Sequence, residues 1–109
     1  MKTYRHYING ALWDPALGEW FDSENPYTGE VWAKIARGNA EDVDRAVTAA
    51  KAAFDGEWGA TGPTARGKLM VKLAEIIERE AVRLGEIEVR DNGKLIAEMG
   101  AQTKYLAEW

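Results

Sequence analysis

Few residues of this chain combine a reactive side chain with neighbours of matching chemistry. His6 is its only histidine, and a single histidine in an expected edge strand is more often a surface residue than a general base or a metal ligand. The chain has no cysteine, which excludes a disulfide framework, a thiolate zinc site and a cysteine nucleophile within it.

Asp91-Asn92-Gly93-Lys94 is the one local cluster with chemical character. A carboxylate at this point would stand beside the free carbonyls of a helix end, and carboxylate and carbonyl oxygens together suit a hard cation. An ordinary helix-ending turn is the simpler interpretation of the same residues.

Two other patterns are not typical of a site. The glycine-rich segment 56–62 has the wrong spacing for a dinucleotide-binding fingerprint, follows no strand and lacks the Gly-Lys-Ser/Thr of a phosphate loop, so it is expected to be a connecting loop. The carboxylates of the following helix alternate with Lys and Arg, as on a solvent-exposed helix face. They are Glu75, Glu78, Glu80, Glu86 and Glu88.

Length and composition indicate one ordinary globular domain. The 109 residues are 46% hydrophobic and 29% charged, with a net charge of -4, so no basic surface for nucleic acid is expected. Neither a signal peptide nor an apolar run of the roughly 20 residues that span a bilayer is present, and a cytoplasmic protein without membrane contacts is predicted. Five tryptophans are many for this length, and we expect part of this surface to meet further protein.

Residues 1–38 are predicted to form β-hairpin elements. Tyr4–Ile8 and Ala11–Trp13 flank an Asn-Gly pair, which favours a tight hairpin because both residues tolerate positive φ. Trp20 and Phe21 then lead into the turn 25–29. Val31 to Ala36 follows with alternating character and is predicted to be a strand.

Residues 39–109 are predicted to form three helices. Asn39 is a suitable N-cap for the first, which ends at Gly56, and 57–63 is expected to be a loop. The second runs from near Thr64, with a bend near Gly85, to Gly93. The third is expected to carry Leu95, Met99, Leu106 and Trp109 on one face. No stop signal follows Trp109, so we expect the chain to be cut within a helix.

The order of these segments resembles the NAD(P)-dependent aldehyde dehydrogenase superfamily. The resemblance covers essentially the whole chain, and its landmarks are specific only in combination. They are Tyr7-Ile8-Asn9-Gly10 with Trp13 as the first hairpin, Asn25-Pro26-Tyr27-Thr28-Gly29-Glu30-Val31 as the following turn, Glu41 to Val47 with Ala52-Ala53-Phe54 as the first helix, then Trp58, Arg66, Leu73, Ala74 and Asp91-Asn92-Gly93-Lys94.

This resemblance implies that the chain is the N-terminal portion of an α/β enzyme several times longer, a portion that packs against the nucleotide-binding domain. In that family a cysteine attacks the aldehyde to give a thiohemiacetal, hydride passes to the nicotinamide of NAD or NADP, and a glutamate activates water to release the acid. These residues and the cofactor's loop have no counterpart here. We therefore expect no catalytic or cofactor-binding residue in this chain.

Two further roles are implied by the resemblance. Several family members hold a structural monovalent cation, which here would bind the carbonyls of Ser23 and Glu24 and the side chain of Asp91. The third helix lines the substrate entrance in the family, so Tyr105 is a candidate entrance residue.

The sequence is thus interpreted as an α+β fragment of a dehydrogenase that oxidises an aldehyde to a carboxylic acid. Its expected partners are the remainder of that chain and further copies in a dimer or tetramer. Two alternatives stay open, namely a stand-alone helical module for protein interaction and a decayed gene product without a role.

Overall fold

The computed structural model describes all residues from 1 to 109. Five short strands are followed by helices, so the predicted α+β architecture is confirmed. The chain forms two compact units: a first unit of residues 1–23 and 31–61, and a second unit of residues 24–30 and 62–109. The turn 24–30 groups with the later helices, and residues 31–61 group with the first strands.

A two-stranded antiparallel hairpin opens the first unit, as predicted. β2 (His6–Ile8) pairs with β3 (Ala11–Trp13), with His6 opposite Trp13. Asn9 and Gly10 have φ values of 50° and 77°, the left-handed conformations that a tight hairpin turn requires. The indole Nε1 of Trp13 donates to the Ile8 carbonyl at 3.2 Å and closes the hairpin.

Tyr4 was predicted to belong to this hairpin, and that prediction is wrong. It ends β1 (Lys2–Tyr4), which pairs in parallel with β5 (Val31–Ala36), with Tyr4 opposite Ile35. The alternation of a sequence indicates an extended strand but does not identify its partner. The sheet order is β1-β5-β4, with β4 spanning Trp20–Glu24.

The expected alternation of β5 holds only in part. Ala33 and Ala36 are its buried residues although they were expected on opposite faces, while Trp32 is half-buried. The indole Nε1 of Trp32 donates to Ser23 Oγ at 3.0 Å, and its ring meets that of Tyr4 edge-on with centroids 5.7 Å apart. Hydrogen bonding and ring packing of this aromatic side chain tie β5 to both neighbouring strands.

Helix α1 (Ala40–Asp55) begins where the sequence predicts. Asn39 is its N-cap, and a capping box joins the side chains and backbone N–H groups of Asn39 and Asp42. The segment after it is not wholly a loop, since Glu57–Ala60 forms one helical turn, α2. Gly59 is required in that turn because a Cβ atom would collide with the Phe54 carbonyl.

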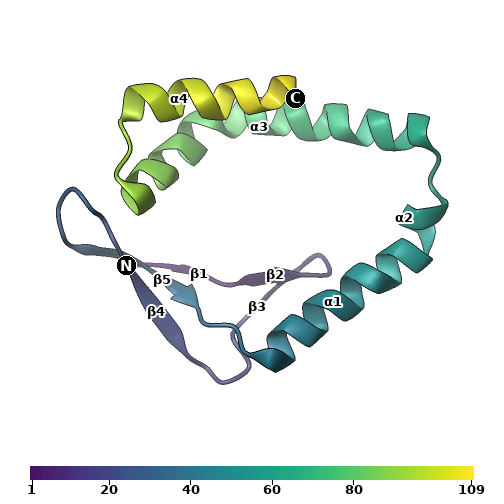
Figure 1. Ribbon diagram of the computed structural model, residues 1–109, viewed down its shortest axis with the longest axis horizontal. Helices are drawn as coiled ribbons and strands as arrows, with labels where there is room; N and C mark the ends of the chain where they lie inside the picture. The colour runs from purple at the N-terminus through teal and green to yellow at the C-terminus, as the bar shows by residue number, and fades with distance from the viewer. The chain divides into compact units, whose positions relative to one another are not determined.

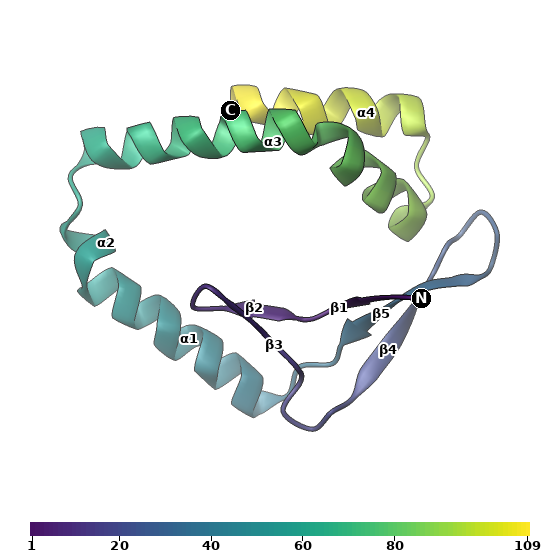
Figure 2. The same cartoon turned by 180° about the vertical axis from the view of Figure 1, so that it is seen from behind.

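The second unit consists mainly of α3 (Pro63–Asn92) and α4 (Ile96–Tyr105). Gly93 ends α3 with φ 76°, and its N–H donates to the Val89 carbonyl at 2.9 Å. This is the predicted residue in left-handed conformation at the C-terminus of the helix. Figures 1 and 2 show α4 lying antiparallel beside the later part of α3, where α3 changes direction.

Small residues allow α3 and α4 to approach closely. Ala81 and Gly85 of α3 are buried against Met99 and Thr103 of α4. A Cβ atom on Gly85 would lie 3.3 Å from Thr103 Oγ1 and 3.5 Å from the Met99 carbonyl oxygen. The hydroxyl of Thr103 lies 3.0 Å from the Ala81 carbonyl oxygen and 2.7 Å from that of Met99, so it hydrogen-bonds at the helix contact.

The end of the chain differs from the predicted third helix. Leu95 is the N-cap of α4, and the α-helix ends at Tyr105, where a 3-10 turn, η1 (Leu106–Glu108), follows. Of the four residues expected on one apolar face, only Met99 is buried. The spacing of apolar residues therefore predicted the helix but not which of its residues the helix contact covers.

Candidate functional site

The predicted cation ligands lie near the ends of β4 and α3. Ser23 and Glu24 are the last residues of β4, and Asp91 is exposed in the last turn of α3. Within the second unit the turn that follows Glu24 meets the end of α3, because a Cβ atom on Gly93 would lie 3.1 Å from Pro26 Cβ. The segments carrying Glu24 and Asp91 are thus brought together, whereas Ser23 belongs to the first unit.

The contacts at the end of α3 are those of the chain itself. No three His, Cys, Asp or Glu side chains converge anywhere in the structure. The neighbouring contacts are those of a helix-ending turn: Asn92 Oδ1 accepts from the Lys94 N–H at 2.9 Å, and Lys94 Nζ lies 3.9 Å from Glu88 Oε1. The cation site stays a prediction.

Tyr105, the candidate substrate-entrance residue, is the last residue of α4. Its side chain is exposed, and its ring meets that of Trp109 edge-on with centroids 5.9 Å apart. Both rings line an open groove of about 330 Å³ together with Glu88 and Gln102. This position is compatible with an entrance, and the role itself stays a prediction.

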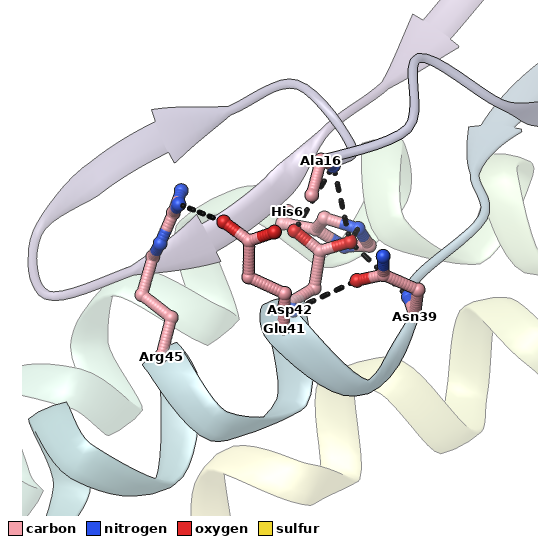
Figure 3. Close-up of polar contacts among 6 residues, drawn as sticks. All are labelled: His6, Ala16, Asn39, Glu41, Asp42 and Arg45. Carbon is pink, nitrogen blue, oxygen red and sulfur yellow. Dashed lines mark hydrogen bonds and ion pairs between the residues drawn. The ribbon is translucent and has the colours of Figure 1, made fainter.

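The most buried ionisable group was not predicted as a site residue. Asp42 is 3% exposed, and its carboxylate accepts hydrogen bonds from the N–H groups of Ala16 at 3.2 Å and Asn39 at 3.1 Å. Asn39 Oδ1 accepts in return from the Asp42 N–H at 3.0 Å. Figure 3 shows the carboxylate between the start of α1 and the loop at Ala16. It therefore fastens that loop to the helix.

The surroundings of Asp42 keep it ionised. Burial alone would raise the pKa of the Asp42 carboxyl, but the N–H groups of Asn39 and Ala16, with His6 and Arg45, outweigh burial and lower this pKa below its ordinary value. His6 Nε2 lies 3.7 Å from Asp42 Oδ2, and this nitrogen is buried without a hydrogen bond. The expectation that His6 is a surface residue is thus only partly right. The hydrogen bonds of Asp42 hold structure, and its distance of 3.7 Å from His6 Nε2 is longer than a hydrogen bond.

The sequence signal for Asp42 was local and incomplete. A carboxylate three residues after an N-cap indicates a helix start. It does not reveal the partner at Ala16, which lies 26 residues away in sequence.

Similarity to known proteins identifies the family of this chain. The sequence profile of the aldehyde dehydrogenase family matches residues 13–109. The chain belongs to the aldehyde dehydrogenase family. The predicted resemblance to the N-terminal portion of these enzymes is confirmed.

Individual relatives are similar in sequence and structure to nearly the whole of this chain. It is 44% identical over 110 aligned residues to (Z)-2-((N-methylformamido)methylene)-5-hydroxybutyrolactone dehydrogenase of Acinetobacter baylyi, covering 100% of this chain and 22% of that protein. It superimposes with a TM-score of 0.94 and 33% identity on the NAD-dependent aldehyde dehydrogenase of Sinorhizobium meliloti, covering 99% of this chain and 22% of the other. Betaine aldehyde dehydrogenase of Staphylococcus aureus was solved in complex with NAD+. The chain superimposes on it with a TM-score of 0.86 and 33% identity, covering 95% of this chain and 22% of the other.

The chain spans about a fifth of the length of these relatives. Their activity therefore belongs to proteins in which this region is one part. None of the helices in this chain has both the length and the apolar character needed to cross a bilayer.

Proposed function

We propose that this chain is the N-terminal part of an NAD(P)-dependent aldehyde dehydrogenase that converts an aldehyde to a carboxylic acid. The observation that carries the proposal is the 44% identity to a dehydrogenase over 100% of this chain but only 22% of that protein. Bound NAD(P) would accept hydride from the substrate. The residues of this chain contribute a scaffold made of the strands, the capped helix α1, the turn 24–30 and the α3–α4 contact.

The isolated chain is not a competent catalyst on this proposal. It contains no cysteine, so it offers no thiol to attack an aldehyde. Its partners are the remainder of the dehydrogenase chain and further copies in a cytoplasmic dimer or tetramer. The relatives named above support NAD as the cofactor, with NADP as the alternative.

Two finer roles belong to the same proposal. The carbonyls of Ser23 and Glu24 and the carboxylate of Asp91 would hold a structural monovalent cation, and Tyr105 would line the substrate entrance. The contact between Pro26 and Gly93 supports the first role, and the open groove beside Trp109 supports the second.

A stand-alone interaction module is the second candidate function. A module would have to bury its apolar side chains alone or in a homo-oligomer, whereas a fragment exposes them. Val47, Phe54 and Trp109 are 60%, 71% and 90% exposed, which favours the fragment. Cooperative unfolding of the 109-residue chain as a monomer would support a module, whereas binding of a hydrophobic dye and broad amide resonances would support a fragment.

The intact mass of the purified natural protein tests the main proposal first. A mass several times 12.1 kDa is expected, and aldehyde-dependent formation of NADH or NADPH by that protein should follow. A mass of 12.1 kDa, or a longer protein that reduces neither cofactor with any of a panel of aliphatic and aromatic aldehydes, would contradict it.

A further inference from the structure

Two of the four asparagines in this chain precede a glycine. An asparagine loses its side-chain amide when the backbone nitrogen of the next residue attacks its Cγ atom, so the type of that next residue decides how easily the reaction occurs. Glycine has no Cβ atom to obstruct the attack, whereas proline has no N–H to lose. Asn25 precedes a proline and Asn39 precedes an alanine. The Asn-Gly pairs at 9–10 and 92–93 are therefore the positions where this chemistry is least hindered.

The two Asn-Gly pairs are both open to water but differ in what holds them. Asn9, Gly10, Asn92 and Gly93 are all exposed, and the two glycines have nearly the same positive φ, 77° and 76°. Solvent access and glycine conformation are thus matched between the pairs. A difference in their reactivity has to come from hydrogen bonds, because a nitrogen or an amide that is hydrogen-bonded must first be released.

The Asn92-Gly93 pair is held on both sides of the bond that would form. The Gly93 N–H donates to the Val89 carbonyl at 2.9 Å, and Asn92 Oδ1 accepts from the Lys94 N–H at 2.9 Å. Asn92 Nδ2 also donates to Glu88 Oε1 at 3.3 Å. Attack by the Gly93 nitrogen requires this helix terminus to open, so the pair is protected.

The Asn9-Gly10 pair has no comparable restraint. It forms the tip of the β2-β3 hairpin, where Ile8 and Ala11 are the last paired residues. Neither the Gly10 N–H nor the Asn9 carboxamide makes a hydrogen bond, and a Cβ atom on Gly10 would have no atom within 4 Å. Asn9 is also the only residue other than glycine with a positive φ, at 50°, so rotation away from this conformation relieves backbone strain.

We propose that Asn9 is a site of spontaneous deamidation and that its modification opens the first hairpin. The Gly10 nitrogen forms a bond to Asn9 Cγ and loses its proton, while the C–N bond of the side-chain amide breaks and ammonia leaves. The product is a five-membered succinimide. Water then adds to either carbonyl of the ring and opens it to aspartate or isoaspartate. Water is the sole co-reactant, and the inference does not rest on the proposed function.

Isoaspartate is incompatible with the hairpin turn. It carries the chain through its side chain, so an extra backbone atom enters a turn whose two residues bring Ile8 opposite Ala11. Loss of this register also displaces Trp13, whose indole donates to the Ile8 carbonyl and whose ring centre lies 4.8 Å from the Arg45 guanidinium. Modification of Asn9 therefore loosens β3 from α1.

Peptide mapping of the complete protein tests the site, with Asn92 as the internal control. The protein is aged in mildly alkaline buffer, which favours loss of the proton from the attacking nitrogen, and the deamidated forms of each peptide are quantified by mass spectrometry. Release of the two hydrogen bonds of 2.9 Å at Asn92 and Gly93 slows the attack there. We therefore expect Asn9 to deamidate at least roughly tenfold faster than Asn92. Equal rates, including no reaction at either position, or a faster reaction at Asn92 would overturn the proposal.

Two variants connect the chemistry to the hairpin. Asn9→Gly removes the amide and keeps a residue that favours positive φ at this position of the turn, and Asn92→Ala is the matched control. Hydrogen exchange of the peptide that covers residues 1–13 reports the loosening. It should rise with ageing in the wild type and in Asn92→Ala, and stay constant in Asn9→Gly. An equal rise in Asn9→Gly would show that the hairpin opens without deamidation and would overturn that part of the proposal.

Discussion

The close contact between α3 and α4 can be tested by the substitution Gly→Ala at three helical positions, Gly67, Gly85 and Gly100. A Cβ atom on Gly67 or Gly100 would have no atom within 4 Å, whereas a Cβ on Gly85 would meet Thr103 Oγ1 at 3.3 Å. Gly→Ala inside a helix gains about 1 kcal/mol in the free energy of unfolding when nothing obstructs the methyl group. Gly67→Ala and Gly100→Ala should therefore each stabilise the protein.

Gly85→Ala should have the opposite sign. The same gain of about 1 kcal/mol is outweighed by about 2 kcal/mol for forcing a methyl group into a packed helix contact, which leaves a net loss of about 1 kcal/mol. The difference from Gly67→Ala is then about 2 kcal/mol. Thr103→Ala removes the obstructing oxygen, so in that background Gly85→Ala should recover about 1 kcal/mol.

Urea unfolding of the complete protein, followed by far-ultraviolet circular dichroism, provides the assay. A shift of the midpoint without a change of slope identifies a stability effect. If Gly85→Ala stabilises as much as Gly67→Ala, and Thr103→Ala does not alter its effect, then α3 and α4 are not in the close contact described above.

Three further predictions concern the cap, the buried carboxylate and the end of α3. Asn39→Ala should lower the free energy of unfolding by about 1 kcal/mol in the same urea assay, because the α1 cap is lost. The pKa of Asp42 is lowered in the folded state, so the ionised Asp42 should stabilise the fold above pH 3.8, its ordinary pKa, and this stabilisation should be lost as the pH falls through the folded pKa. Urea midpoints measured against pH should therefore fall less steeply in acid for Asp42→Asn than for the wild type. Gly93→Ala should destabilise by more than about 1 kcal/mol, since a φ of 76° disfavours a side chain and Pro26 is already close, whereas equal stability of wild type and variant would contradict that contact.

Elements defined by local chemistry could be predicted from the sequence. The Asn9-Gly10 hairpin, the Asn39 cap and the Gly93 terminus depend on residues that lie next to one another, and all three are found where expected. Backbone conformations with positive φ and side chains that cap a helix are encoded within a few positions.

Long-range pairings could not be predicted in this way. Nothing near Tyr4 indicates that β1 pairs in parallel with β5, and nothing near Asp42 indicates its bonds to Ala16. The short helix α2 was missed because a glycine-rich segment favours a loop, while its conformation follows from the close approach of Gly59 to Phe54. The roles of Ser23, Glu24, Asp91 and Tyr105 came from family resemblance, since their own contacts specify no ligand.

The small core explains why so much of this chain's stability is expected to come from interfaces. Its buried apolar residues are Ile8, Ala33 and Ala36 in the first unit and Ala81 and Met99 in the second, so only two are large. Burying a large aliphatic side chain contributes roughly 1.5–3 kcal/mol, whereas ordering the backbone of each residue costs about 1–2 kcal/mol. These two large buried side chains form a small core for a chain of 109 residues. Exposed apolar side chains, among them Val47, Phe54 and Trp109, are a further source of burial, and covering them with the remainder of the proposed dehydrogenase would add to the stability of this region.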